Sequence, residues 1–342
     1  MATSTIKTEH IIKFTAAEIA NLWSSYFNDT LAVCTITHFL AHIQDKEIET
    51  VLNMALDHSN THIGKLKSFF NEEKLTVPEA FSIVNDVYPD APRLFTDDFY
   101  LFYIQNIGKL GLATYTLALS NSARLDMCEY FTECLNESSA LFNKATEILL
   151  KKGSFSRAPF IPDKEKVQFI EKQSYLGELL GKPRPLNVIE ISNIYFNLIQ
   201  NQLGKTLLIG FSQVAKSTKV REYMIRGREI SDKHVRVFCD ILDKEFLPSA
   251  GSWDSLATDS TSATFSDKLM MMHVTMLNSA GIGHYGMSIG TSARKDIGAD
   301  FLRLMLEIVA FSEDGANLMI ENSWLEQIPQ AMDRDKLAEN RD

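Results

Sequence analysis

The sequence predicts an all-α protein made of two tandem, ferritin-like four-helix bundles joined by a proline-containing linker. Apolar residues recur with a period near 3.6 over long stretches, as in amphipathic helices. The chain also repeats itself after roughly 170 residues, and the connections within each repeat run short, long, short. At 342 residues the chain is too long for one compact core and fits two domains.

The internal repeat has two offsets. A shift of 172 positions matches Glu18 with Glu190, Leu31 with Leu203, and His62 with His234. A shift of 170 positions then matches Gly111 with Gly281, Tyr115 with Tyr285, and Glu137 with Glu307. The change indicates a two-residue length difference in a loop between Leu75 and Phe95. A period this long indicates whole domains rather than a solenoid, so we expect units at 1–152 and 187–342 with a linker at 153–186.

The first unit reads as two helical hairpins. Thr15 and Glu18 form a capping box that opens a helix ending near Gln44, and a second helix follows at once. A long crossover from 76 to 95 contains Pro78, Pro89 and Pro92. A third helix is expected over 97–119 and a fourth over 122–151, with Ser122 as its N-cap. This order of connections is typical of a ferritin-like bundle.

The linker carries Pro159, Pro162, Pro183 and Pro185 around a short amphipathic piece at 166–180. Its apolar residues are Phe169, Ile170, Leu176, Leu179 and Leu180. Their spacing favours a short helix that packs on a bundle. We therefore expect two separately folded bundles, related by a pseudo-twofold axis and clamped by this segment.

Charge and composition limit the partners. The net charge is −10, and the 34 Lys and Arg residues are scattered among 44 Asp and Glu, which argues against a nucleic-acid surface. The most apolar stretches contain polar residues such as Lys109 and His273, so no membrane insertion is expected. No secretory h-region opens the chain, and the four cysteines form no CxxC, which favours a cytoplasmic protein with reduced thiols.

Several stretches resemble a known family. These are the tandem units, the run Arg157-Ala158-Pro159-Phe160-Ile161-Pro162, and the segment from Gly181 to Asn187 followed by Glu190-Ile191. Together they resemble the DUF3231 proteins of spore-forming bacilli, over nearly the whole chain. The resemblance implies a ferritin-like fold and a loose kinship with coat-F-type spore coat proteins, so spore association is an open expectation. It implies no activity.

The ligand code of a di-iron centre is missing. Ferritin-type sites use an inward Glu on two helices and Glu-x-x-His on the other two. Here Glu137 is followed three residues on by Ala140, and Glu307 by Ala310. No phosphate loop, GxSxG or HExxH occurs either, so the sequence predicts no enzyme.

Histidines on the inner stripe of each unit are the main site candidates. His62 and His234 fall near the middle of the second helix of their units, where a polar side chain needs a partner. Glu137 and Glu307 lie at a similar depth on the fourth helix, with Thr30 and Gln202 as polar neighbours on the first. One interpretation is a metal site in each bundle with fewer ligands than a di-iron centre. The other is a buried His–Glu hydrogen bond that fixes helix register. His38 and His42 are expected on a solvated face.

Three functions follow from these residues. The preferred hypothesis is a non-catalytic bundle protein with a structural, storage or coat-associated role and without a bound metal. Such a protein is compatible with a homo-oligomer. The second is a ferritin-like metal or redox protein with a divalent metal at His62–Glu137 and His234–Glu307. The third is a small-ligand binder, because glycines on the third helix can open a cavity or allow close packing. These glycines are Gly108, Gly111, Gly281 and Gly283.

Overall fold

The structure is a computed structural model that describes residues 12–162, 166–177 and 183–339. The first half contains the long helices α1 (Ala16–His42), α2 (Lys46–Glu72), α4 (Asp97–Ser120) and α5 (Leu125–Lys152). The second contains α6 (Val188–Val214), α7 (Thr218–Lys244), α8 (Asp267–Thr291) and α9 (Lys295–Glu321). Short elements are α3 (Ile83–Asp86), η1 (Gln173–Leu176), η2 (Asp254–Leu256) and α10 (Arg334–Glu339). Within these ranges there is no β-strand, which confirms the all-α class.

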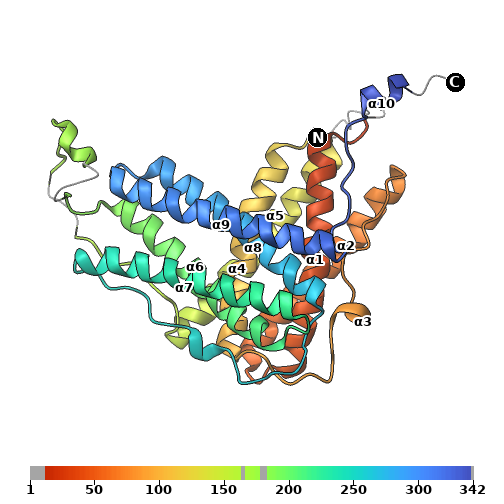
Figure 1. Ribbon diagram of the computed structural model, residues 1–342, viewed down its shortest axis with the longest axis horizontal. Coiled ribbons are helices and arrows are strands. Elements are labelled where there is room, and N and C mark those ends of the chain that lie inside the picture. Colours follow the sequence, from red (N-terminus) through yellow and green to blue (C-terminus); the bar gives the residue numbers. More distant parts are fainter. Residues whose placement is uncertain (1–11, 163–165, 178–182, 340–342) are drawn as a thin grey trace, which may run out of the picture.

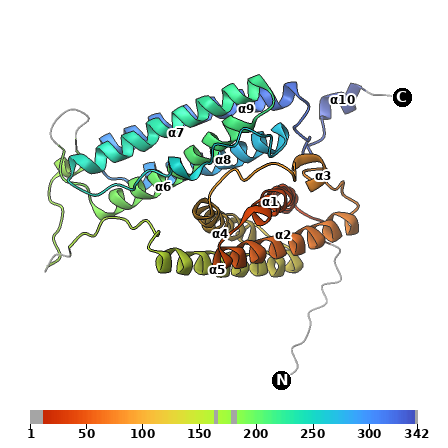
Figure 2. The same cartoon turned by 90° about the horizontal axis from the view of Figure 1, so that it is seen from below.

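The two halves form two adjacent groups of helices. Figure 2 shows α6, α7, α8 and α9 on one side and the four long helices of the first half on the other. In Figure 1 the long helices of the two halves run across one another rather than in parallel, as α1 and α9 show. The linker runs along one end of the pair, and α3 lies towards the opposite end (Figure 2).

The helix positions confirm the repeat. Helices α1 and α6 begin 172 positions apart, as do α2 and α7. Helices α4 and α8 begin 170 positions apart, as do α5 and α9. The change of offset therefore falls in the long crossover between the second and third helices of each half. The connections are short, long and short in both halves, as expected.

The capping box at the start of α1 is present, but the expected N-cap of α5 is wrong. Thr15 and Glu18 exchange both capping hydrogen bonds. The hydroxyl of Ser122 instead donates to the carbonyl of Ala118, and Arg124 occupies the N-cap position. The reason is that Glu18, fully buried, accepts from the backbone N–H groups of Ala123 and Arg124. A carboxylate on α1 thus takes over the role of a local cap.

The two crossovers meet at the pseudo-twofold axis. Two isolated antiparallel bridges pair Val87 with Phe265 and Phe95 with Ala257. A shift of 170 turns each bridge into the other, because Val87 matches Ala257 and Phe95 matches Phe265. The hydroxyl of Tyr103 lies 3.1 Å from Nε2 of His273, and these two residues are also equivalent positions. Contacts between equivalent residues are what a twofold relation requires.

The apolar core is shared between the halves. One continuous buried cluster contains residues of α1, α2, α4 and α5 together with Leu203, Phe211 and Phe265 of the second half. A second cluster, around Ile194 and Phe301, belongs to the second half alone. Much of the first half's core therefore continues into its neighbour.

The expected linker clamp does not form. Among the described residues of the expected segment, 166–177, only η1 is helical, and Val167, Phe169 and Ile170 are 85%, 87% and 62% exposed. Leu179 and Leu180 lie outside the described residues. The halves are joined through the crossovers and the shared core, so the linker is not needed to hold them.

His38 is not solvated, contrary to expectation. Its ring is 2% exposed and packs against Phe265 of the second half, with ring centroids 5.3 Å apart. The equivalent position, Gly210, lies against Phe95 of the first half. Sequence periodicity placed this face outside one bundle, and the second bundle covers it. Burial, with help from the neighbouring His42, lowers the pKa of His38 to about 4.

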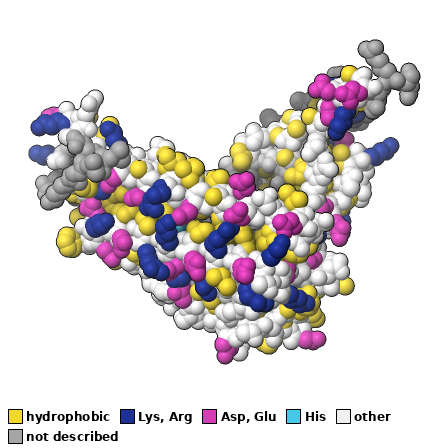
Figure 3. All heavy atoms as spheres, in the orientation of Figure 1, with side chains coloured by type: hydrophobic (Ala, Val, Ile, Leu, Met, Phe, Trp, Pro, Cys, Tyr) yellow, Lys and Arg dark blue, Asp and Glu magenta, His cyan; other side chains and the backbone are white. Residues whose placement is uncertain are grey.

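The surface agrees with the composition. Lys and Arg side chains are interspersed with Asp and Glu over the face drawn in Figure 3, without a large area of one sign. Throughout the described ranges, every helix is too short or too polar to cross a bilayer.

Candidate functional site

The first bundle buries His62 between two carboxylates. Its Nε2 lies 2.6 Å from Oε2 of Glu137 on α5, and its Nδ1 lies 3.4 Å from Oδ1 of Asp29 on α1. His62 and Asp29 are 6% and 5% exposed, whereas the Glu137 side chain keeps 34% of its surface. Cys134, one turn before Glu137, lies close enough to the ring to affect its pKa.

These partners fix the charge of His62. A carboxylate accepts hydrogen bonds and cannot donate them, so each ring nitrogen must carry a proton to serve both Asp29 and Glu137. Burial alone would lower the pKa of His62, but the contacts with Asp29 and Cys134 outweigh it and raise the pKa to about 11. Burial also raises the pKa of Asp29, partly offset by His62. His62 is therefore a buried cation held by two acids.

The second bundle arranges the equivalent histidine differently. Nε2 of His234 lies 2.9 Å from Oε2 of Glu307, but its Nδ1 lies 2.9 Å from the hydroxyl of Tyr285. That hydroxyl in turn accepts from Nδ2 of Asn201 at 2.8 Å. Asn201 is the residue that matches Asp29 at the offset of 172. This acid-to-amide difference accompanies the change of partners, as does the difference between Cys134 and its match Leu304.

The donors and acceptors around His234 describe a neutral ring. Tyr285 donates to Nδ1, and Nε2–H donates to Glu307, so each hydrogen bond in the series from Asn201 to Glu307 has one donor and one acceptor. Burial lowers the pKa of His234, against the contact with Glu307. Glu307 itself has a lowered pKa, because Lys233 and His234 outweigh its burial.

The sequence identified the His–Glu pairs but misplaced their neighbours. Thr30 donates to carbonyls of its own helix, and the amide of Gln202 donates to Gly251, so neither bonds to its histidine. The contacting residues on α1 and α6 are one position earlier, at Asp29 and Asn201. A charged residue beside the apolar stripe of α1 was the available signal, because a buried carboxylate needs a partner.

The arrangement leaves little room for a metal. Asp29 and Glu137 bind opposite nitrogens of the His62 ring, so a single ion at ligand distances of about 2 Å cannot meet both carboxylates and the ring. Both nitrogens of His234 are engaged in the same way. Across the described ranges, no three His, Cys, Asp or Glu side chains are grouped to hold a metal ion.

The family can be assigned at this point. The model of a family of proteins of unknown function, DUF3231, matches residues 4–167 and 175–337. The chain belongs to the DUF3231 family. Its two matches coincide with the two bundles, so each bundle with its histidine cluster is one DUF3231 repeat.

Other comparisons add little. The crystal structure of a putative spore coat protein from Bacillus halodurans is similar over 44% of this chain and 98% of its own, with 16% sequence identity and a TM-score of 0.41. The curated proteins contain no match to the chain.

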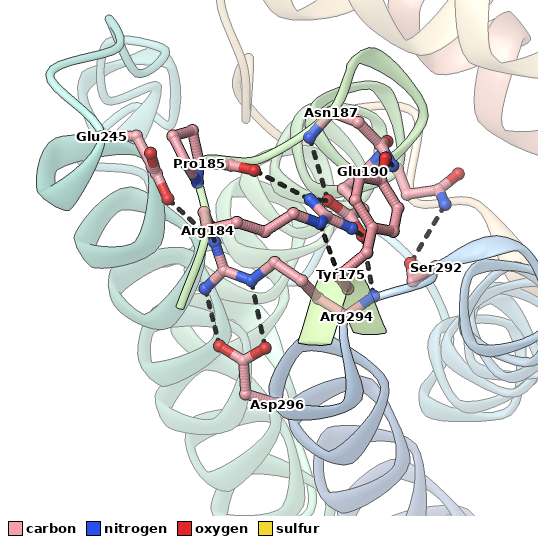
Figure 4. A network of polar contacts seen from close by, with 10 residues as sticks. Tyr175, Arg184, Pro185, Asn187, Glu190, Glu245, Ser292, Arg294 and Asp296 are labelled. Atoms are coloured by element: carbon pink, nitrogen blue, oxygen red, sulfur yellow. Dashed lines mark hydrogen bonds and ion pairs between the residues drawn. The ribbon is translucent and has the colours of Figure 1, made fainter. Parts of the chain in front are cut away.

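The linker run that resembles DUF3231 ends in an ionic network at one end of the second bundle. Figure 4 shows Arg184 reaching Glu190, with bonds of 2.9 and 2.8 Å to its two oxygens. Its guanidinium also stacks on Tyr175 at 3.9 Å from the ring centroid. Asn187 caps α6 in a capping box with the same Glu190. The run therefore ties the linker to the start of α6.

Arg294 extends this network to α7 and α9. It bonds to Glu245 at 2.9 Å, to both oxygens of Asp296, and to the carbonyl of Arg184 (Figure 4). In the first bundle the matching Arg124 contacts Glu73 and Asp126. All these acids come from the protein itself, so each arginine ties together segments of its own bundle.

Proposed function

We propose that this DUF3231 protein is a non-catalytic bundle protein with a structural, storage or coat-associated role, and that its histidine clusters hold the helices in register. The observation that supports this proposal is that each ring nitrogen of His62 and His234 already has a hydrogen-bonding partner within the protein. Each cluster connects three helices of its bundle at mid-length. In the first bundle these are α1, α2 and α5, and in the second they are α7, α8 and α9. Buried polar contacts of this kind specify one packing over others.

The metal or redox alternative rests on the same residues. The nitrogen–oxygen distances of the His62–Glu137 and His234–Glu307 pairs are 2.6 and 2.9 Å, so a small outward movement of each carboxylate would admit an ion at about 2 Å from both atoms. Two protein ligands, however, give a weak site, and structural or catalytic zinc sites use three or four. The redox alternative also needs an open coordination position. In the first bundle Asp29 occupies the other nitrogen of the His62 ring, and in the second Tyr285 occupies that of the His234 ring.

Elemental analysis separates the two proposals. The protein is purified without a His-tag, alongside a variant with Glu137→Gln and Glu307→Gln, and iron, manganese and zinc are measured per chain. We expect substoichiometric metal in both proteins. Stoichiometric metal in the wild type that the double variant lacks would overturn the structural proposal. The glutamines keep the size of the side chains, so a folded variant is checked by far-UV circular dichroism.

A further inference from the structure

The second bundle contains a cavity beside its histidine cluster. It has a volume of about 70 Å³ and lies between α6, α7, α8 and α9. His234 and Tyr285 line it, and both are buried to at least 99%. Gly204 and Gly281 also line it, and a Cβ atom on either would find its nearest neighbour only at 3.9 or 3.7 Å.

Glycine placement lets the third and fourth helices pack more closely in the first bundle than in the second. A Cβ on Gly111, the match of Gly281, would lie 2.2 Å from Oγ of Ser138. A Cβ on Gly108 would lie 2.9 Å from backbone atoms of Phe142. Both glycines thus let α5 approach α4 closely. In the second bundle Asn278 stands at the position of Gly108, and Ile308 at that of Ser138, so α8 and α9 cannot approach in the same way.

The lining is mostly apolar and carries no charged side chain. Apolar side chains such as Leu208, Leu277 and Phe311 form most of the wall, and no Asp, Glu, Lys or Arg contributes to it. Burial lowers the pKa of His234 and of His284, so both rings are neutral near pH 7. Nδ2 of Asn278 and Nδ1 of His284 are buried and have no hydrogen-bonding partner. A buried N–H donor without a partner favours an acceptor oxygen nearby.

We propose that this cavity is a binding site for a small uncharged molecule that presents a carbonyl or hydroxyl oxygen on a short apolar body. The volume, about 70 Å³, is about half that of an engineered cavity of ~150 Å³ that takes up benzene, so the ligand has about three or four heavy atoms. An ionised ligand is disfavoured, because the wall supplies no counter-charge. The oxygen accepts from Asn278, and the methyl or methylene groups contact the leucines and Phe311.

Acetamide and acetate test the proposal as a matched pair, because they have nearly the same shape and differ in charge. Each is titrated into the ¹⁵N-labelled full chain, and amide shifts are followed near residues 278, 284 and 285. We expect saturable shifts with acetamide at millimolar concentration and at least tenfold weaker binding of acetate. Equal affinity for both probes, or shifts that never saturate, would refute a site for uncharged ligands.

Two variants make the result specific to the cavity. The double variant Gly204→Ala, Gly281→Ala adds two methyl groups to the cavity. The wall has room for them, so the variant should fold, and the filled cavity should no longer bind acetamide. Gly283→Ala is the control, since it lies on the same helix, is exposed and has nothing within 4 Å of its Cβ. Binding that survives the double substitution places acetamide elsewhere and rejects the assignment. The metal analysis above does not depend on this outcome.

Discussion

The two bundles of this chain share one backbone plan and differ in the chemistry of their centres. In the first, a protonated His62 lies between Asp29 and Glu137; in the second, a neutral His234 lies between Tyr285 and Glu307. The first centre is ionic, and the second is neutral and has a cavity beside it. A duplicated fold can therefore keep its helices and change the charge state of a buried residue through the few side chains that surround it.

Removing each histidine gives the largest expected contrast. His62→Ala leaves Asp29 buried without its counter-charge, which costs about 3–5 kcal/mol of unfolding free energy, whereas His234→Ala breaks neutral hydrogen bonds and costs about 1–3 kcal/mol. Urea denaturation of both variants at pH 7 measures the difference. The loss of ring volume is the same in both, so equal costs would show that His62 is not a buried cation.

The matched glycines give the next contrast. Gly111→Ala forces a Cβ against Ser138 and should cost about 1–3 kcal/mol. Gly281→Ala faces the cavity and should raise stability by up to about 1 kcal/mol, since alanine is the better helix former. Thermal unfolding of the two variants should thus shift in opposite directions. A shift of the same sign and size in both would contradict the difference in helix approach.

Exchanging Asp29 and Asn201 should exchange the charge states. Asp29→Asn removes an obligatory acceptor, so the pKa of His62 should fall from its raised value, and Asn201→Asp should raise the pKa of His234. Histidine ring signals followed by NMR against pH measure both. If the pKa of His62 stays near 11 in the Asp29→Asn variant, Asp29 is not what sustains the charge of His62, and the proposed difference between the two bundles is wrong.

The charge states of the two histidines also predict opposite pH dependences of the unfolding free energy. The folded pKa of His62 lies above its ordinary value of 6.5, so its contribution is complete below pH 6.5 and is lost as pH rises towards about 11. The folded pKa of His234 is lowered, so its contribution is complete above 6.5 and is lost as pH falls below it. Asp29→Asn should therefore flatten the alkaline side of the stability profile. The acid side also reflects the buried His38, His273 and His284.

Local patterns predicted the helices and the repeat, because periodicity and caps depend on residues near in sequence. They also identified the His–Glu pairs, since both partners lie at mid-helix. They failed where a distant segment decides: Glu18 caps α5 across the bundle, and Phe265 buries His38. The prediction for the linker segment was wrong because amphipathic spacing groups apolar residues but does not show whether a surface is there to receive them.

The exteriors of α5 and α9 differ as well, and this difference should have the smallest effect on stability. Leu302 and Leu306 on α9 are 45% and 56% exposed, where α5 has Thr132 and Asn136. Substituting both leucines by glutamine keeps helix propensity nearly constant and removes little buried area, so unfolding free energy should change by less than about 0.5 kcal/mol. Denaturation at two protein concentrations checks this. A larger cost that appears only at the higher concentration would mean that copies of the chain bury these leucines between them, and a cost at both would mean that α9 packs more tightly than its exposure indicates.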